Sequence, residues 1–134
     1  FMKHSGWYPD YVDRLFKRGT AKFSDHLVHE HLLPNGSKEK LKHHFLHYSY
    51  RDFSQVLKKV DAYSSAAAQQ AFNQGKKSNF TQALAHGFWG FFRTYVLKRG
   101  FLDGRYGLAL AISNAATSYY KYLKLWQLHN SESK

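Results

Sequence analysis

Apolar residues recur at every third or fourth position between residues 51 and 74, as at Val56 and Val60. This spacing predicts an amphipathic helix, because residues three and four apart lie on the same face of a helix. Ser49 fits the N-cap of this helix, and Gly75 fits the position just after its C-terminus. We expect the helix to serve packing.

A second, more apolar segment spans residues 80–97, and a third helical pattern spans residues 106–128. A transmembrane helix needs roughly 20 predominantly apolar residues. The segment 80–97 is shorter and contains Arg93, so its pattern favours a buried or interfacial helix. Residues 98–105, between the two helical patterns, form a basic loop.

The N-terminal part of the chain shows a different periodicity. Residues 11–17 and 23–30 alternate apolar and polar side chains and are rich in aromatic and branched types. They predict the two strands of a β-hairpin, joined by a glycine-containing turn at residues 18–21. A third strand is expected at residues 41–48, although residues 38–44 also fit the start of a helix.

The charge of the chain is strongly basic. Lys and Arg number 20 against 9 Asp and Glu, which gives a formal net charge of +11. From residue 68 onward the acidic residues are Asp103 and Glu132 alone. A basic surface attracts phosphate in nucleic acid, anionic lipid or nucleotide-sugar, and charge does not choose among them. The sequence has no cysteine, which excludes disulfides and thiolate metal sites.

Four separated motifs follow one another in the order that one enzyme family shows. They are GWYPDY with RLFKRG, VHE, HYSYRD and GFLDG, at residues 6–19, 28–30, 47–52 and 100–104. In these motifs the chain resembles the family 2 glycosyltransferases of bacterial envelope assembly. The likeness is greatest to the lipopolysaccharide core glucosyltransferases, and it extends from Gly6 to about Trp126.

The resemblance implies an α+β architecture for this fragment. Residues 1–50 would be the last strands, with a terminal β-hairpin, of a GT-A-type α/β nucleotide-sugar domain. Residues 51–134 would be a three-helix C-terminal tail, packed on that domain and on the membrane surface. The family's metal-binding DxD motif does not occur in this sequence. We therefore expect the chain to be the C-terminal part of a longer enzyme and to be inactive alone.

The resemblance also suggests which side chains carry the chemistry. Glu30, which closes the VHE motif, is the expected general base for the acceptor hydroxyl, and Asp10 is its rival. Arg14 and Arg18 are expected to contact the donor diphosphate, because a guanidinium offers a planar fork to phosphate. Side chains alternate across a strand, so His29 and Glu30 point to opposite faces unless the strand bends or ends there.

The expected cofactors are a nucleotide-sugar donor and a divalent cation, Mg²⁺ or Mn²⁺. The cation would neutralise the leaving diphosphate and would be bound mainly by the DxD-bearing part of the enzyme. In this chain His29 and His47 are the candidate metal ligands, since imidazole can complete a Mn²⁺ site.

The implied function is inverting transfer of a hexose, with glucose as the expected sugar, to the lipopolysaccharide inner core. The enzyme would be cytoplasmic and peripheral on the inner face of the bacterial inner membrane. The alternative is a basic helical nucleic-acid-binding or membrane-associating module without catalysis. No nucleic acid is expected as a partner, because the aromatics cluster with apolar neighbours and no recognition motif occurs.

The helical region 80–128 is expected to lie against an anionic membrane surface without crossing it. Lys98, Arg99 and Arg105 would meet the head groups. The aromatic residues that would enter the interface are Phe88, Trp89, Phe91, Phe92, Tyr95, Tyr119, Tyr120 and Trp126. The competing interpretation is that these aromatics pack on the catalytic domain.

Overall fold

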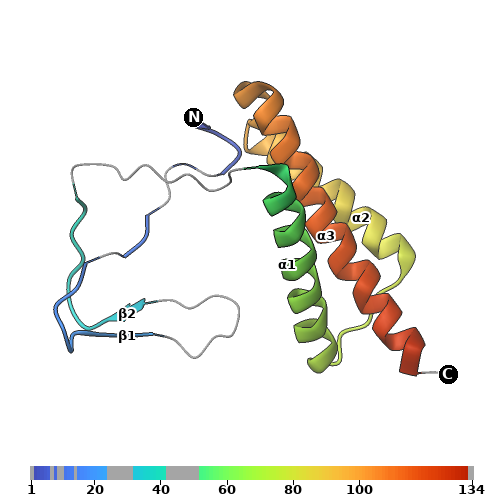
Figure 1. Cartoon of the computed structure of the whole chain (residues 1–134), viewed down its shortest axis with the longest axis horizontal. Helices are drawn as coiled ribbons and strands as arrows, with labels where there is room; N and C mark the ends of the chain where they lie inside the picture. The colour runs from blue at the N-terminus through green and yellow to red at the C-terminus, as the bar shows by residue number, and fades with distance from the viewer. Residues whose placement is uncertain are drawn as a thin grey trace. The chain divides into compact units, whose positions relative to one another are not determined.

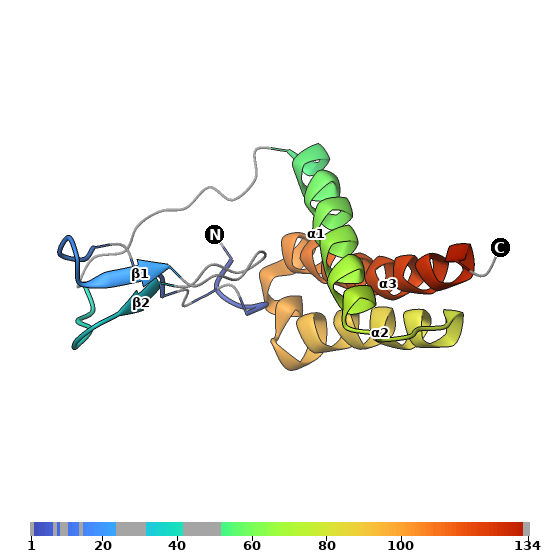
Figure 2. The ribbon, with the colours of Figure 1, turned by 90° about the horizontal axis from the view of Figure 1, so that it is seen from below.

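The chain divides into two compact units, residues 10–49 and residues 50–134 together with residues 1–9. The computed structural model describes residues 2–6, 8, 11–13, 15–23, 32–41 and 52–132, without the side chains of residues 23, 34 and 132. Figures 1 and 2 show the helices and strands of both units. The assignment of residues 1–50 to a catalytic domain stays a prediction.

The smaller unit contains a two-stranded antiparallel sheet. Strand β1 (Ala21–Phe23) pairs with strand β2 (Leu32–Pro34), so that Ala21 lies opposite Pro34. A tight turn precedes β1, in which the amide of Thr20 donates to the carbonyl of Lys17 at 3.0 Å. Gly19 has a φ of 86° in this turn, which confirms the turn predicted there.

The predicted pairing of residues 11–17 with residues 23–30 is wrong. The partner of β1 is β2, and no strand occurs among the described residues between 11 and 17. Side-chain contacts hold this segment instead. The ammonium of Lys38 lies 2.6 Å from a carboxylate oxygen of Asp13, and that of Lys40 lies 4.4 Å from the ring centroid of Tyr11. Residues 24–30 and 42–48 lie outside the described part of the chain.

Helix α1 (Phe53–Asn73) confirms the first predicted helix, with a different cap. The carboxylate of Asp52 accepts a hydrogen bond from the amide of Gln55 at 2.9 Å, and Asp52 has an extended backbone. Asp52 is therefore the N-cap, because its side chain satisfies an amide that has no partner within the helix. The prediction that Ser49 caps the helix is wrong.

The C-terminus of α1 ends as predicted at Gly75, which has a φ of 71°. The amide of Gly75 donates to the carbonyl of Phe72 at 2.8 Å. The amide of Lys76 donates to the carbonyl of Ala71 at 3.0 Å. These two bonds form a Schellman motif, which occupies the last free carbonyls of the helix.

The predicted helix 80–97 is confirmed as one helical run with a change of pitch. Helix α2 (Phe80–Phe92) continues into a single π-helical turn, Arg93–Leu97. A 3₁₀-helix, Gly100–Asp103, lies within the predicted basic loop and leads directly into helix α3 (Gly104–Glu132). Helix α3 is thus longer at both ends than the predicted 106–128.

Helix α3 is the centre of the larger unit, because it packs against both α1 and α2 (Figures 1 and 2). Against α1 the core consists of Ala68, Ala71 and Leu125, with Phe72 and Leu128 packed beside it. Against α2 the contact depends on small residues. A Cβ added to Gly87 would lie 3.1 Å from the Cβ of Tyr119, so glycine allows the two helices to approach closely.

The described residues contain no helix that is both long and apolar enough to span a membrane. They are mostly helical, with one small sheet. The derivation of the small unit from a GT-A-type domain stays a prediction.

Candidate functional site

Most of the predicted catalytic and binding residues lie outside the described part of the chain. They are Asp10, Arg14, His29, Glu30 and His47. Their proposed roles stay predictions, and the structure does not bring them together or separate them.

Arg18 is the predicted site residue that the structure describes. It lies in the turn before β1, next to Gly19, and its side chain is exposed. An exposed guanidinium on a turn is accessible to a phosphate-bearing ligand. Its expected partner in that role, Arg14, is not among the described residues.

Among the described residues, no three His, Asp or Glu side chains lie close enough to hold a metal ion. The described histidines have other neighbours. The ring of His86 stacks on Tyr122 with centroids 3.8 Å apart, and Nε2 of His129 lies 2.8 Å from the carbonyl oxygen of Lys76. The predicted ligands His29 and His47 lie outside the described residues, so the metal site stays a prediction.

Asp103 gathers the N-terminal segment around its carboxylate. The amides of Lys3 and His4 donate to its two oxygens at 3.1 and 3.0 Å. Nδ1 of His4 and the hydroxyl of Ser5 lie 3.0 Å from the same oxygens. The Asp103 side chain is 4% exposed. The carboxylate therefore binds a segment about a hundred residues away in sequence.

The same segment is held at a second point. The amide of Ser5 donates to the carbonyl of Lys98 at 2.9 Å, and Ser5 is 1% exposed with a φ of 63°. Only a few per cent of residues other than glycine adopt a positive φ. The side chain of Lys98 lies where a Cβ of Gly6 would be. Residues 3–6 are therefore fastened to the connection between α2 and α3.

The surroundings of Asp103 lower the pKa of its carboxyl group. Burial raises this pKa by penalising the charged form, but the hydrogen bonds from His4, Lys3 and Ser5 together outweigh it. The net result is a pKa below the ordinary value of 3.8. Asp103 is thus ionised at neutral pH, and its charge is compensated by the N-terminal segment.

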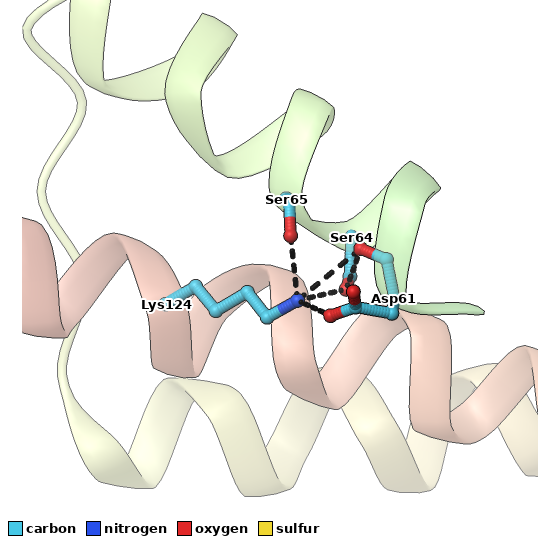
Figure 3. Close-up of polar contacts among 4 residues, drawn as sticks. All are labelled: Asp61, Ser64, Ser65 and Lys124. Carbon is cyan, nitrogen blue, oxygen red and sulfur yellow. Dashed lines mark hydrogen bonds and ion pairs between the residues drawn. The ribbon is translucent and has the colours of Figure 1, made fainter. Parts of the chain in front are cut away.

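A polar network joins α1 to α3 (Figure 3). The ammonium of Lys124 donates to a carboxylate oxygen of Asp61 at 2.6 Å and to the hydroxyl oxygens of Ser64 and Ser65 at 2.9 and 2.7 Å. Ser64 is fully buried and donates in turn to the carbonyl of Asp61 at 3.0 Å. An open cavity of about 350 Å³ adjoins this network. Because the lysine is fully partnered, the network serves helix packing.

Exposed aromatic residues gather on α2. The side chains of Phe88 and Trp89 are 72% and 52% exposed, and both rings contact Phe92, with centroids 6.4 and 6.0 Å away. We name these three residues the aromatic face. Of the other aromatics predicted to meet the membrane, Tyr120 and Trp126 are exposed, while Phe91, Tyr95 and Tyr119 are half-buried.

Exposed cations follow the aromatic face along the chain. They are Arg93, Lys98, Arg99 and Arg105. Asp103 is the one acidic residue between residues 62 and 131 of the sequence, and its carboxylate is engaged by residues 3–5. The larger unit therefore presents positive charge beside apolar surface at the end of α2.

The polar residues that accompany these cations were not predicted from the sequence. Thr94 is 5% exposed, and its hydroxyl oxygen accepts a hydrogen bond from the side-chain amide of Asn114 at 3.2 Å. The scarcity of acids near Arg93 was a signal in the sequence. The contact between the π-helical turn and α3 was not, because it joins residues twenty apart.

The distant relatives found by comparison with known proteins include two from Rickettsia. Both are described as an uncharacterized glycosyltransferase. The chain is 27% identical to that of Rickettsia conorii over 88 residues, which are 66% of this chain and 30% of the relative. It is 28% identical to that of Rickettsia felis over 85 residues, which are 63% of this chain and 29% of the relative.

The matched segments therefore span less than a third of each relative's length. No family model and no solved structure matches the chain. The names of these relatives support a glycosyltransferase family for the chain. Neither name specifies a lipopolysaccharide core glucosyltransferase.

Proposed function

We propose that this chain is the C-terminal part of an inverting glycosyltransferase of family 2. It transfers a hexose, which we take to be glucose, from a nucleotide-sugar to the inner core of lipopolysaccharide. The observation that carries the proposal is the likeness to two proteins described as glycosyltransferases over about two thirds of the chain. The motifs GWYPDY, VHE and GFLDG support the finer assignment to envelope assembly.

The proposed chemistry is a single displacement at the anomeric carbon of the donor sugar. The carboxylate of Glu30 takes the proton of the acceptor hydroxyl, whose oxygen attacks the anomeric carbon as the nucleoside diphosphate departs. Asp10 is the alternative base. Arg14 and Arg18 hold the diphosphate through their guanidinium groups. A divalent cation, when bound, supplies charge neutralisation of the leaving group, and His29 and His47 are its candidate ligands in this chain.

We further propose that the larger unit lies on an anionic membrane surface. The support is the aromatic face together with the exposed cations Lys98, Arg99 and Arg105. Aromatic side chains suit the boundary between head groups and acyl chains, and basic residues near it attract anionic lipid. A reversible surface contact fits an enzyme whose acceptor is anchored in lipid.

A transfer assay on the longer natural protein that contains this chain tests the proposal. Purified enzyme is incubated with a truncated lipopolysaccharide acceptor and a panel of nucleotide-sugars, and the anomeric configuration of the product is read by NMR. We expect transfer from a nucleoside diphosphate hexose with inversion. A retained configuration contradicts the inverting mechanism, and the absence of transfer from every donor contradicts the enzymatic proposal.

The 134-residue chain alone serves as the second arm of this assay. We expect it neither to hydrolyse nor to transfer from any donor, because the sequence has no DxD motif. Transfer by this chain alone would contradict the assignment of donor binding to another part of the protein.

A further inference from the structure

A polar pocket lies where α2 passes into the π-helical turn and meets α3. Its volume is about 220 Å³. Two cations line it, Arg93 and Lys98, and none of the described carboxylates does. Three neutral polar side chains from α3 complete the wall, those of Asn114, Thr117 and Ser118. We name this cavity the Arg93 pocket.

The π-helical turn explains how two cations come to line one pocket. In an α-helix, residues five apart are separated by about 140° around the axis, since about 3.6 residues complete a turn. Here the amide of Lys98 donates to the carbonyl of Arg93 at 2.9 Å, which is the five-residue bond of a π-helix. The wider turn brings both residues to the same side. Single π turns of this kind occur frequently at functional sites.

Close packing of α2 on α3 forms the floor of the pocket. A Cβ added to Gly90 would lie 3.1 Å from the hydroxyl oxygen of Ser118, so a larger side chain here would fill the space. Thr94, which is buried, also lines the pocket and accepts a hydrogen bond from Asn114 at 3.2 Å.

The neutral side chains leave several donors for a ligand. Asn114 uses one of its two N–H groups on Thr94, and the hydroxyl of Thr94 keeps its own proton to donate. The hydroxyl of Thr117 donates to the carbonyl of Ser113 at 2.9 Å, so it contributes no donor to the pocket. Together with Arg93 and Lys98, the pocket offers donors and positive charge.

The local charge is uncompensated among the described residues. The one acid between residues 62 and 131 is Asp103, and residues 3–5 bind its carboxylate. No ion pair of Arg93 or Lys98 occurs in the described part of the chain. A group with several acceptor oxygens and negative charge complements this arrangement, and an Arg guanidinium matches phosphate geometry.

We propose that the Arg93 pocket binds a phosphate group. Its volume is below the ~300–1,000 Å³ typical of sites for whole small-molecule ligands, so it takes the phosphate and leaves the remainder of the molecule outside. The phosphate belongs either to a soluble phosphorylated molecule or to a phospholipid head group. This inference does not depend on glycosyl transfer.

Titration of the full chain with inorganic phosphate tests the proposal. Amide shifts are followed by ¹⁵N-resolved NMR at constant ionic strength, with chloride as the matched anion. We expect saturable shifts at the side-chain amide of Asn114 and the backbone amide of Ser118. Linear shifts spread over all basic residues, equal for phosphate and chloride, would overturn the proposal.

Charge-matched variants separate the pocket from general attraction. Arg93→Gln removes a charged hydrogen-bond donor and should raise the Kd for phosphate about tenfold or more. Arg105→Gln removes the same charge from an exposed residue outside the pocket and should change the Kd less than about twofold. Equal weakening by both variants would overturn the proposal. Ser118→Ala, which removes one donor with little change in volume, should weaken phosphate binding while the thermal unfolding midpoint is retained.

Vesicle binding then distinguishes the two sources of phosphate. The full chain is sedimented with phosphatidylcholine vesicles that contain or lack phosphatidic acid. Binding that requires phosphatidic acid, and that both inorganic phosphate and Arg93→Gln reduce, assigns the pocket to a lipid head group. Phosphate binding without such vesicle binding assigns it to a soluble ligand. Failure to bind either probe would overturn the proposal.

Discussion

The ammonium of Lys124 lies 2.6 Å from a carboxylate oxygen of Asp61, sixty-three residues earlier in the sequence. The ion pair joins α3 to α1 (Figure 3). The Lys124 side chain is 27% exposed. The N–H groups of a mostly buried lysine need hydrogen-bond acceptors. The hydroxyl oxygens of Ser64 and Ser65 supply two of them.

We expect Lys124→Met to lower the free energy of unfolding by about 1–2 kcal/mol, because it removes charged hydrogen bonds between two helices. The ion pair with the exposed Asp61 carboxylate by itself would contribute less than about 1 kcal/mol to the free energy of unfolding. Urea denaturation measures the loss. The matched control on the same helix is Lys121→Met. The ammonium of Lys121 lies over the Tyr122 ring, 5.1 Å from the ring centroid. Equal losses for both variants would contradict a specific role for Lys124.

Asp103→Asn should destabilise the larger unit by about 1–3 kcal/mol at pH 7, because the charged acceptor of several hydrogen bonds is lost. The lowered pKa of Asp103 sets the pH dependence of this effect. A carboxyl group with a lowered folded pKa stabilises above its unfolded pKa, and that contribution disappears as pH falls through the folded pKa. The difference between the two proteins should therefore be constant at neutral pH and shrink below pH 3.8.

Urea denaturation at pH 7, 5 and 3 checks this prediction. The control is Glu132→Gln, which also removes one negative charge, at the opposite end of α3 from Asp103. A difference between wild type and Asp103→Asn that grows toward pH 3 would have the wrong sign.

The contact between α2 and α3 should reject larger side chains at Gly87. A Cβ there lies 3.1 Å from the Cβ of Tyr119, so Gly87→Val forces the helices apart and should cost about 1–3 kcal/mol. Ala85→Val, at an exposed position of the same helix, should cost less than about 1 kcal/mol. Thermal unfolding followed by circular dichroism compares the two. Equal stability would show that the helices adjust without penalty.

In the longer enzyme that we propose, Glu30→Gln should lower kcat by about 10²–10⁴-fold if Glu30 is the general base. The fold should survive, because glutamine keeps the shape of the side chain. Asp10→Asn is the paired variant. Near-normal turnover after Glu30→Gln, with a large loss after Asp10→Asn, would transfer the role to Asp10.

Membrane contact should depend on both salt and the basic loop. Replacement of Lys98, Arg99 and Arg105 by Ser should reduce co-sedimentation with anionic vesicles, since each such charge contributes roughly 1 kcal/mol near an anionic surface. High salt should weaken wild-type binding, because it screens exposed charges.

The matched control removes three charges from other exposed lysines, Lys58, Lys76 and Lys77. This triple Ser variant should bind anionic vesicles more tightly than the loop variant. If the intact enzyme stays in the supernatant at low salt, the aromatic face does not contact lipid.

Strand pairing was the part of the fold that the local pattern predicted wrongly. The alternation of residues 11–17 is real, but Asp13 pairs with Lys38 and Tyr11 contacts Lys40. The edge of β1 bonds to β2 instead. An alternating pattern shows that a segment can form a strand, and the choice of partner depends on chain segments that compete for the same edge.

The sequence by itself determined where the helices lie and where α1 ends, but not the N-cap of α1 or the bounds of α3. Period and capping act within a few residues, so the run of α1, its stop at Gly75 and the continuous helical segment after Asn79 follow from local chemistry. Tertiary structure alone decided that Asp103 binds residues 3–5 and that Asn114 joins Arg93 at one pocket. The physical reason is distance along the chain, because contacts between remote residues depend on how the helices pack rather than on any local pattern.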